Sequence, residues 1–343
     1  MLWTVLTELG RRCNSVEFVL DSKAPYLQKT KYNVLQKSSG FFSEIAKKQL
    51  ARFGVVPESG ITHFIDISGF AYGDFWGAKK AKRRLGRRAA AGRASIYMLP
   101  QAFGPFSDDD LVKEMQRICK SSKLVCARDA KSLDYLKGIG ISNAELLPDI
   151  TFALDVSDRN IVKPDGDYVC IIPNAKLGES GAMDNTDQIE LYSQVADSVR
   201  ASGLNPVIVL HEPKADKDIG EELSRRLEAP VLAPDDARDL KALIGGATAV
   251  VTSRFHGLVS ALSTGVPAMA VGWSHKYTEL LADFDCEELA FTGDRSEFLK
   301  VLDANLCDIQ GRENIKNKLE KPRTEAKRKL EELFDRLARQ IDS

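Results

Sequence analysis

The chain has 343 residues, 43% of them hydrophobic and 28% charged, a length typical of two globular domains and a composition that excludes disordered and collagen-like classes. The formal net charge of −1 provides no overall positive field, so the sequence predicts no nucleic-acid partner. The six scattered cysteines lack a Cys-x-x-Cys pair and no run approaches roughly 20 apolar residues, which predicts a cytoplasmic protein without a disulfide frame, a metal site or a membrane span.

The first predicted element is a helix at the start of the chain. Within residues 1–13, apolar residues recur at helical spacing, namely Leu2, Trp3, Val5, Leu6 and Leu9. A doubly wound domain normally opens with a strand and a loop before its first helix. We therefore expect that first strand and loop to be missing, either because the gene model is truncated or because the protein is a shortened variant.

Short apolar segments then alternate with helical patterns, which is typical of βαβ units with parallel strands. The segment 155–166 is rich in Asp, Asn, Pro and Gly without periodicity, so we expect a linker there. The sequence thus predicts an α/β protein with Rossmann-like domains at 1–154 and 167–311, followed by an amphipathic helix at 312–343. The expected strands are 16–20, 61–67, 95–99 and 124–127 in the first domain, and 168–172, 206–210, 248–252 and 268–271 in the second.

The most informative segment is 249–272, which predicts a buried strand, a tight polar loop, a short helix ended by Gly265 and a second strand. This order places Ser253, Arg254 and His256 at the carboxyl end of a strand and at a helix N-terminus, where open α/β sheets bind ligands. The helix dipole favours an anion there, and the Arg254 guanidinium is a fork of donors matched to phosphate or carboxylate. Histidine exchanges a proton readily near working pH, so we expect His256 to be a proton donor.

Lys276 follows the next predicted strand. Because neighbouring strand ends lie about 5 Å apart in a parallel sheet, Lys276 can reach the same anion. In the alternative interpretation, Arg254 pairs with a nearby carboxylate, His256 only caps its helix, and Lys276 is a solvated residue at a helix start. The strand-loop-helix context favours the functional interpretation of Arg254 and His256, whereas for Lys276 both interpretations stay open.

Other strand ends supply further candidates. Arg128 follows the strand at 124–127 and precedes Asp129, which we expect to cap the next helix, so Arg128 is a second candidate anion contact. Gln101 lies in a glycine-containing loop and is a candidate sugar contact, although the loop fits a plain turn equally well. Asn174 and His211 follow two strands of the second domain as candidate substrate contacts, and a lone histidine at a strand end is more often structural.

The run Lys79–Arg88, KKAKRRLGRR, is the strongest block of like charge. Such a run is usually a solvated helix face. The functional alternative is attraction to anionic lipid head groups or to a pyrophosphate-linked saccharide, which limits any membrane contact to the periphery of the bilayer.

Taken together, several segments between about residues 61 and 284 resemble polysaccharide pyruvyl transferases. The Ser253–Gly257 element, Ser-Arg-Phe-His-Gly, with Lys276 downstream is the most specific of them. The resemblance implies a GT-B-like fold, in which two domains with parallel sheets face a cleft. The weaker matching segments are Leu99–Phe106, Ala127–Ser132, Leu147–Phe152 and His211–Glu212.

The resemblance also implies a reaction, the transfer of a pyruvyl group from phosphoenolpyruvate to sugar hydroxyls of a cell-surface or exopolysaccharide precursor, including a lipid-linked one. It implies that Arg128, Arg254 and Lys276 hold the phosphate and carboxylate of phosphoenolpyruvate and that His256 is the general acid. It also implies that the reaction needs phosphoenolpyruvate as donor substrate and no cofactor. The expected location is the cytoplasm, including the inner face of the membrane. Family members usually open with a strand and a glycine-rich loop, so contacts from that loop are expected to be missing here.

Two alternatives stay open. A GT-B glycosyltransferase that uses a nucleotide sugar has the same two-domain cleft, and a helix N-terminus also suits a diphosphate. A truncated or inactive binding homologue would keep the fold without the chemistry.

Overall fold

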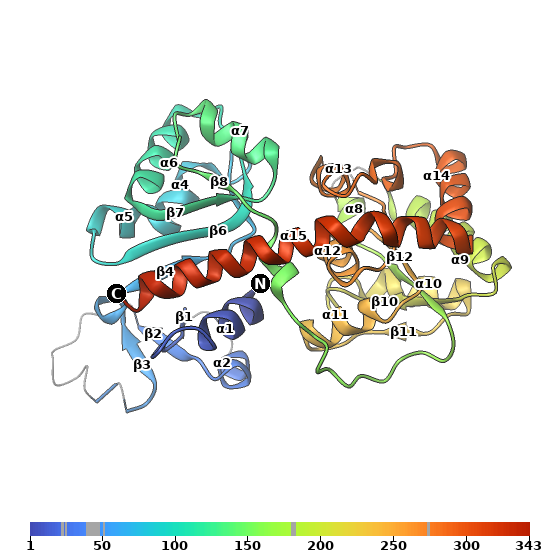
Figure 1. Ribbon diagram of the computed structural model, residues 1–343, viewed down its shortest axis with the longest axis horizontal. Coiled ribbons are helices and arrows are strands. Elements are labelled where there is room, and N and C mark those ends of the chain that lie inside the picture. The colour runs from blue at the N-terminus through green and yellow to red at the C-terminus, as the bar shows by residue number, and fades with distance from the viewer. Residues whose placement is uncertain (22–23, 25, 39–48, 51, 180–182, 273–274) are drawn as a thin grey trace. The chain divides into compact units, whose positions relative to one another are not determined.

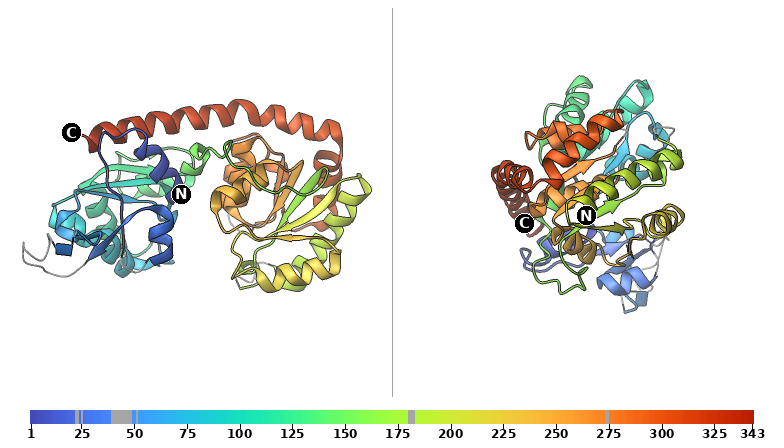
Figure 2. Two further views of the ribbon diagram at one scale, coloured as in Figure 1. Left: turned by 90° about the horizontal axis from the view of Figure 1, so that it is seen from below. Right: turned by 90° about the vertical axis from the view of Figure 1, so that its right-hand side faces the viewer.

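The computed structural model describes the chain except residues 22–23, 25, 39–48, 51, 180–182 and 273–274 (Figure 1). The chain divides into two compact units. Unit 1 comprises Met1–Ala153 together with Lys329–Ser343, and unit 2 comprises Leu154–Arg328. Both chain ends therefore lie in unit 1 (Figure 2). Each unit is built on parallel strands with helices around them, which confirms the predicted α/β fold class.

The main sheet of unit 1 has the strand order β4-β6-β7-β8, with β5 paired to the end of β6, and a second sheet has the order β1-β2-β3. All pairings between these strands are parallel. The central strand β6 is buried along almost its whole length, as expected for a strand covered on both faces. The strands are β1 (Val19–Leu20), β2 (Leu35–Ser38), β3 (Val55–Pro57), β4 (His63–Asp66), β5 (Phe70–Tyr72), β6 (Ser95–Phe103), β7 (Ser122–Ala127) and β8 (Glu145–Leu146).

Two helices of unit 1 begin at capping aspartates. The Asp108 carboxylate accepts the N–H of Asp110 at the start of α6, and the Asp129 carboxylate accepts the N–H of Ser132 in α7, which confirms the predicted cap. The helices are α1 (Leu2–Gly10), α2 (Tyr26–Tyr32), α4 (Gly77–Ala81), α5 (Arg87–Ala91), α6 (Asp109–Ser121) and α7 (Ala130–Gly138), with the short helical turns η1 (Glu58–Gly60), η2 (Lys82–Gly86) and η3 (Ile150–Ala153).

The sheet of unit 2 has the strand order β11-β10-β9-β12-β13, again with parallel pairings. The first strand, β9, is central. The chain builds outward from it to β10 and β11, then returns to add β12 and β13 on the other side. This is the doubly wound order, and its direction reverses between β9 and β12. There, Ile172 at the end of β9 lies opposite Thr252 at the end of β12.

The strands of unit 2 are β9 (Tyr168–Ile172), β10 (Asn205–Val209), β11 (Val231–Leu232), β12 (Ala249–Thr252) and β13 (Ala268–Ala270). The helices are α8 (Lys176–Glu179), α9 (Asn185–Ala201), α10 (Lys217–Leu227), α11 (Ala237–Gly245), α12 (Phe255–Thr264), α13 (His275–Ala282) and α14 (Arg295–Leu302), with the helical turns η4 (Glu287–Leu289) and η5 (Asp303–Cys307). Gly265 ends α12 in the left-handed conformation at φ 80°, as predicted.

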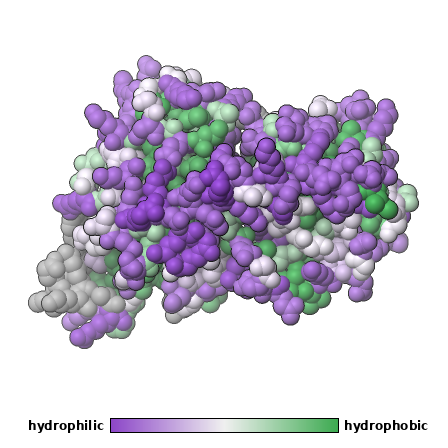
Figure 3. Space-filling model, viewed as in Figure 1, coloured by the Kyte–Doolittle hydropathy of each residue, from purple (hydrophilic) through white to green (hydrophobic). Residues whose placement is uncertain are grey.

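The last helix, α15, spans Ile309–Ile341 and begins slightly ahead of the expected residue 312. Figure 3 shows that mainly hydrophilic residues cover the surface where α15 runs. Within unit 1, Arg12 Nε donates to the Asp335 carboxylate at 2.6 Å. The expected apolar positions of α15 include the buried residues Ala326, Leu330, Leu333, Phe334 and Leu337.

The segment expected as a linker, 155–166, groups with unit 2, where Arg159 pairs with Asp239 at 2.5 Å. Cys119, Cys126, Cys170 and Cys286 are buried free thiols. In the part of the chain that the structure describes, no helix is both long enough and apolar enough to cross a bilayer.

Candidate active site

The candidate site of unit 2 lies at the switch point of its sheet. Beyond β9 come Asn174 and Lys176, and beyond β12 come Ser253 and Arg254. Because the ends of these two strands lie opposite each other, their loops adjoin. Open α/β sheets bind ligands at this point, outside the carboxyl ends of the strands.

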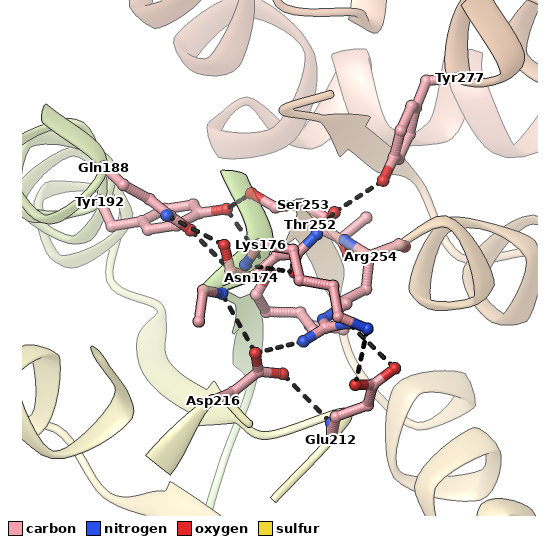
Figure 4. Close-up of polar contacts among 12 residues, drawn as sticks. Asn174, Lys176, Gln188, Tyr192, Glu212, Asp216, Thr252, Ser253, Arg254 and Tyr277 are labelled. Atoms are coloured by element: carbon pink, nitrogen blue, oxygen red, sulfur yellow. Dashed lines mark hydrogen bonds and ion pairs between the residues drawn. The ribbon is translucent and has the colours of Figure 1, made fainter. Parts of the chain in front are cut away.

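The loop after β12 is held by buried hydrogen bonds (Figure 4). The backbone carbonyl of Ser253 accepts from Asn174 Nδ2 at 3.1 Å and from the Tyr277 hydroxyl at 2.7 Å, and the Ser253 hydroxyl bonds to that of Tyr192. Ser253 and Asn174 are buried, so the structure gives both a positioning role. Their direct contact with substrate stays a prediction.

Two glycines allow this close packing. A Cβ atom on Gly257 would lie 2.5 Å from Thr252 Oγ1, and one on Gly272 would lie 2.3 Å from the Tyr277 ring. The first glycine lets α12 start directly against the end of β12, and the second lets Tyr277 reach the Ser253 carbonyl.

Arg254 is buried and faces two carboxylates. Its Nη2 pairs with Asp216 Oδ1, and its Nη1 lies 3.1 Å from Glu212 Oε1. Asp216 is fully buried and also accepts the N–H groups of Ala175 at 3.1 Å and Glu212 at 3.2 Å, so its carboxylate is fixed. Pairing with a carboxylate, the alternative interpretation of Arg254, is therefore present in the structure.

Sequence reasoning missed Asp216, and its position explains why. Asp216 directly precedes α10, as an ordinary capping aspartate would, yet its side chain makes no cap hydrogen bond. The local sequence gives no sign that this carboxylate is directed to Arg254 instead.

Glu212 differs from Asp216 in its exposure. Its side chain is 46% exposed, and its second oxygen lies 3.3 Å from Lys176 Nζ, so Glu212 bridges Arg254 and Lys176. An anion from solvent would therefore compete with Glu212 for Arg254 Nη1, while Asp216 keeps its hold on Nη2.

His256 is the second residue of α12, half-buried, and the N-cap position belongs to Arg254. Its ring stacks on His211 with the centroids 6.3 Å apart and meets Phe255 edge-on at 5.6 Å. Burial, reinforced by the positive charges of His256 and Arg254, lowers the pKa of His211 to about 3. His211 is thus neutral at working pH, and its buried Nδ1 has no hydrogen-bond partner among the described residues. Its predicted contact with substrate stays a prediction.

Lys276 lies near the start of α13. Its Nζ is 5.4 Å from the centroid of the Phe255 ring and 5.3 Å from that of Tyr277. Phe255 is the first residue of α12, so the structure brings Lys276 beside the segment that carries Arg254 and His256.

Arg128 and Gln101 lie in unit 1 and have partners there. Arg128 Nη1 is 3.2 Å from Asp149 Oδ2, with both side chains buried. Gln101 lies within β6 and not in the predicted loop, because the strand continues to Phe103. It is buried, donates to Asp66 Oδ2 at 3.1 Å and accepts from the Ser68 hydroxyl at 2.7 Å. The predicted contacts of Arg128 with the donor and of Gln101 with a sugar stay predictions.

Within the described ranges, no group of three or more His, Cys, Asp or Glu side chains is placed to hold a metal ion. The site of unit 2 brings the Arg254 guanidinium and the imidazole of His256 together at the start of α12, and these are side-chain types suited to anion binding and to proton transfer.

Comparison with solved structures identifies the fold. The S. aureus MnaA–UDP co-structure is 12% identical with a TM-score of 0.57, over 93% of this chain and 87% of that one. UDP-GlcNAc 2-epimerase from Methanocaldococcus jannaschii is 13% identical with a TM-score of 0.55, over 99% of this chain and 95% of that one. At such identities the likeness shows the fold alone, a GT-B-like pair of α/β domains, as the resemblance implied.

A third structure is longer than this chain. An O-GlcNAc transferase mutant from Thermobaculum terrenum is 12% identical with a TM-score of 0.48, over 98% of this chain but only 64% of that one. The chain thus spans less than two thirds of the length of that protein.

No curated protein sequence matches the chain significantly. The sequence model of the family described as polysaccharide pyruvyl transferase, however, matches residues 1–275, a stretch that contains Ser253–Gly257 and ends one residue before Lys276. Because this match covers most of the 343 residues, the chain belongs to the polysaccharide pyruvyl transferase family.

Proposed function

We propose that the site of unit 2 binds phosphoenolpyruvate and that the protein transfers its pyruvyl group to hydroxyls of a saccharide acceptor, forming a ketal and free phosphate. Family membership supports the reaction class. The observation that carries the proposal is that Arg254, His256 and Lys276 gather where β12 and β13 end, at the ligand-binding edge of a doubly wound sheet.

In the proposed reaction, His256 gives its proton to the methylene carbon of the enol phosphate. The neighbouring carbon gains cationic character, and a sugar hydroxyl attacks it while its proton returns to His256. The carbon–oxygen bond to phosphate then breaks, phosphate leaves with the electron pair, and a second hydroxyl closes the ketal while its proton goes to the phosphate. Arg254 and Lys276 stabilise the negative charge of the leaving phosphate and the carboxylate throughout.

Phosphate release from phosphoenolpyruvate in the presence of methyl glycosides tests the proposal, with the ketal methyl signal followed by proton NMR. We expect release that depends on the glycoside. Turnover of UDP-GlcNAc instead would favour a glycosyltransferase. Thermal stabilisation by phosphoenolpyruvate without turnover would indicate a binding homologue, since a ligand of the native state raises its apparent stability.

Arg254→Lys is expected to weaken the binding of inorganic phosphate by roughly tenfold or more. A lysine is a single point charge and cannot hold Asp216 with one nitrogen while offering another to an anion. Isothermal titration with inorganic phosphate measures the change, and an unaltered affinity would remove Arg254 from the anion site.

Glu212→Gln is expected to have the opposite effect and to tighten phosphate binding on the order of tenfold, because the bound anion no longer displaces a charged competitor. Glu221→Gln is the matched control. It makes the same change in charge at an exposed acid of α10 that pairs with Lys217 at 3.6 Å. Weaker binding by Glu212→Gln would instead assign Glu212 to holding Arg254 in place.

A further inference from the structure

The basic run of unit 1 forms one helical surface. α4, η2 and α5 follow one another without a break from Gly77 to Ala91, and this segment contains no acidic residue. Its apolar side is buried through Ala81, Leu85 and Ala89. The exposed cations of the run and its C-terminal flank, apart from the ion-paired Arg84, are together named the basic surface and are Lys79, Lys82, Arg83, Arg87 and Arg93.

The other cations of the run have partners within unit 1. Arg84 pairs with Asp66 at 3.4 Å, Arg88 pairs with Glu58 at 3.1 Å, and Lys80 Nζ lies 3.0 Å from the centroid of the Trp76 ring. By contrast, none of the five residues of the basic surface has an ion pair with any residue that the structure describes. No ion pair with a described residue therefore compensates the positive charge of the basic surface, and this charge can attract an anionic partner.

The nearest helix does not neutralise this charge. α6 packs against α4 and begins with the exposed acids Asp109 and Asp110, whereas Glu114 further along pairs with Arg117 at 2.5 Å. With the exposed N-cap Asp108 included, three exposed acids against the five cations of the basic surface leave an excess of positive charge on this side of unit 1, although the whole chain is nearly neutral.

Aromatic side chains lie directly before the basic helix. Phe75 is 79% exposed, and its ring meets Trp76 edge-on with the centroids 4.6 Å apart. Phe70 is 40% exposed, and its ring also meets Trp76 edge-on, with the centroids 6.2 Å apart. Exposed aromatic rings beside lysines and arginines are typical of segments that lie in the head-group region of a bilayer.

We propose that the basic surface, together with Phe75, docks unit 1 on the surface of an anionic lipid bilayer. The cations are attracted to the negative head groups, and the Phe75 ring inserts at the boundary with the acyl chains. The exposed aromatic side chain favours a bilayer over nucleic acid, because Phe75 lies at one end of the helix and is not interleaved with the cations. The docking is independent of the proposed pyruvyl transfer.

Vesicle sedimentation tests the proposal with the full chain, using phosphatidylcholine alone or mixed with phosphatidylglycerol. We expect binding to the mixed vesicles only, weakening as salt is raised. The triple variant Lys79→Glu, Lys82→Glu, Arg83→Glu should lower the partition coefficient by more than about a hundredfold, since each cation near such a surface contributes roughly fivefold. The matched control, Lys300→Glu, Lys316→Glu, Lys321→Glu, makes the same change in net charge at other exposed lysines and should bind as the unmodified chain does.

Phe75→Ser should lower vesicle binding severalfold at unchanged salt dependence, since it removes only the apolar contact. Three results would overturn the proposal. They are equal binding to neutral and mixed vesicles, an equal loss of vesicle binding in both triple variants, and binding to a single-stranded oligonucleotide but not to mixed vesicles. Phosphate release from phosphoenolpyruvate by the vesicle-deficient triple variant, measured without lipid, keeps this result separate from that of the proposed function.

Discussion

Replacing His256 by alanine is expected to abolish pyruvyl transfer, with kcat for phosphate release falling about 10²–10⁴-fold, because a positioned general acid contributes that much. The ring lies at the start of α12, half-buried and packed on His211 and Phe255. Truncation removes the proposed proton carrier and leaves Arg254 with both of its carboxylate partners. KM for phosphoenolpyruvate should therefore change far less than kcat.

His63→Ala is a suitable control, since it removes another partly buried histidine, one that stacks on Tyr97 in unit 1. Added imidazole should restore part of the activity of the His256 variant by supplying the missing proton. Normal turnover by His256→Ala would disprove the assigned role, and an equal loss in His63→Ala would point to a general effect on folding.

Asp216→Asn is expected to lower the free energy of unfolding by about 3 kcal/mol, near the lower end of the range for breaking a buried ion pair. Asp216 is fully buried and holds Arg254 as well as two backbone N–H groups. An asparagine keeps the shape but leaves the Arg254 guanidinium with Glu212 as its remaining charged partner. Unfolding in urea, followed by circular dichroism, measures the loss.

A double-mutant cycle makes this prediction sharper. Arg254→Met combined with Asp216→Asn removes both charges of the buried pair, so the double variant should be more stable than the sum of the single changes predicts. Asp218→Asn is the matched control, since it alters an exposed aspartate in the first turn of the same helix. If Asp216→Asn proved as stable as this control, Asp216 would not anchor Arg254.

The two carboxylate partners of Arg254 differ in their exposure to solvent. Asp216 is buried and positions the guanidinium, whereas Glu212 is half-exposed and occupies the side that an anion would take. This division explains why opposite results are expected for two acids four residues apart. Loss of Asp216 is expected to cost stability, and loss of Glu212 is expected to increase affinity for phosphate.

Strand positions followed largely from the sequence. The fully buried strands β9 and β12 lie within one residue of the predicted bounds, because a strand covered on both faces requires an unbroken apolar run. β2, β3, β5, β8 and β11 were missed. Each has only two to four residues, and the residues Gln36 and Lys37 of β2 give no apolar run to recognise.

By itself the sequence determined the α/β class, the family and the strand-loop-helix that carries Arg254 and His256, because these depend on apolar periodicity and on residues close together in the chain. Only the tertiary structure decided which partners these residues have. Asp216 and Arg254 are 38 positions apart, as Arg128 and Asp149 are 21 apart. Such pairs form because parallel strands bring distant loops to one edge of a sheet, and no local pattern records which buried charge will compensate another.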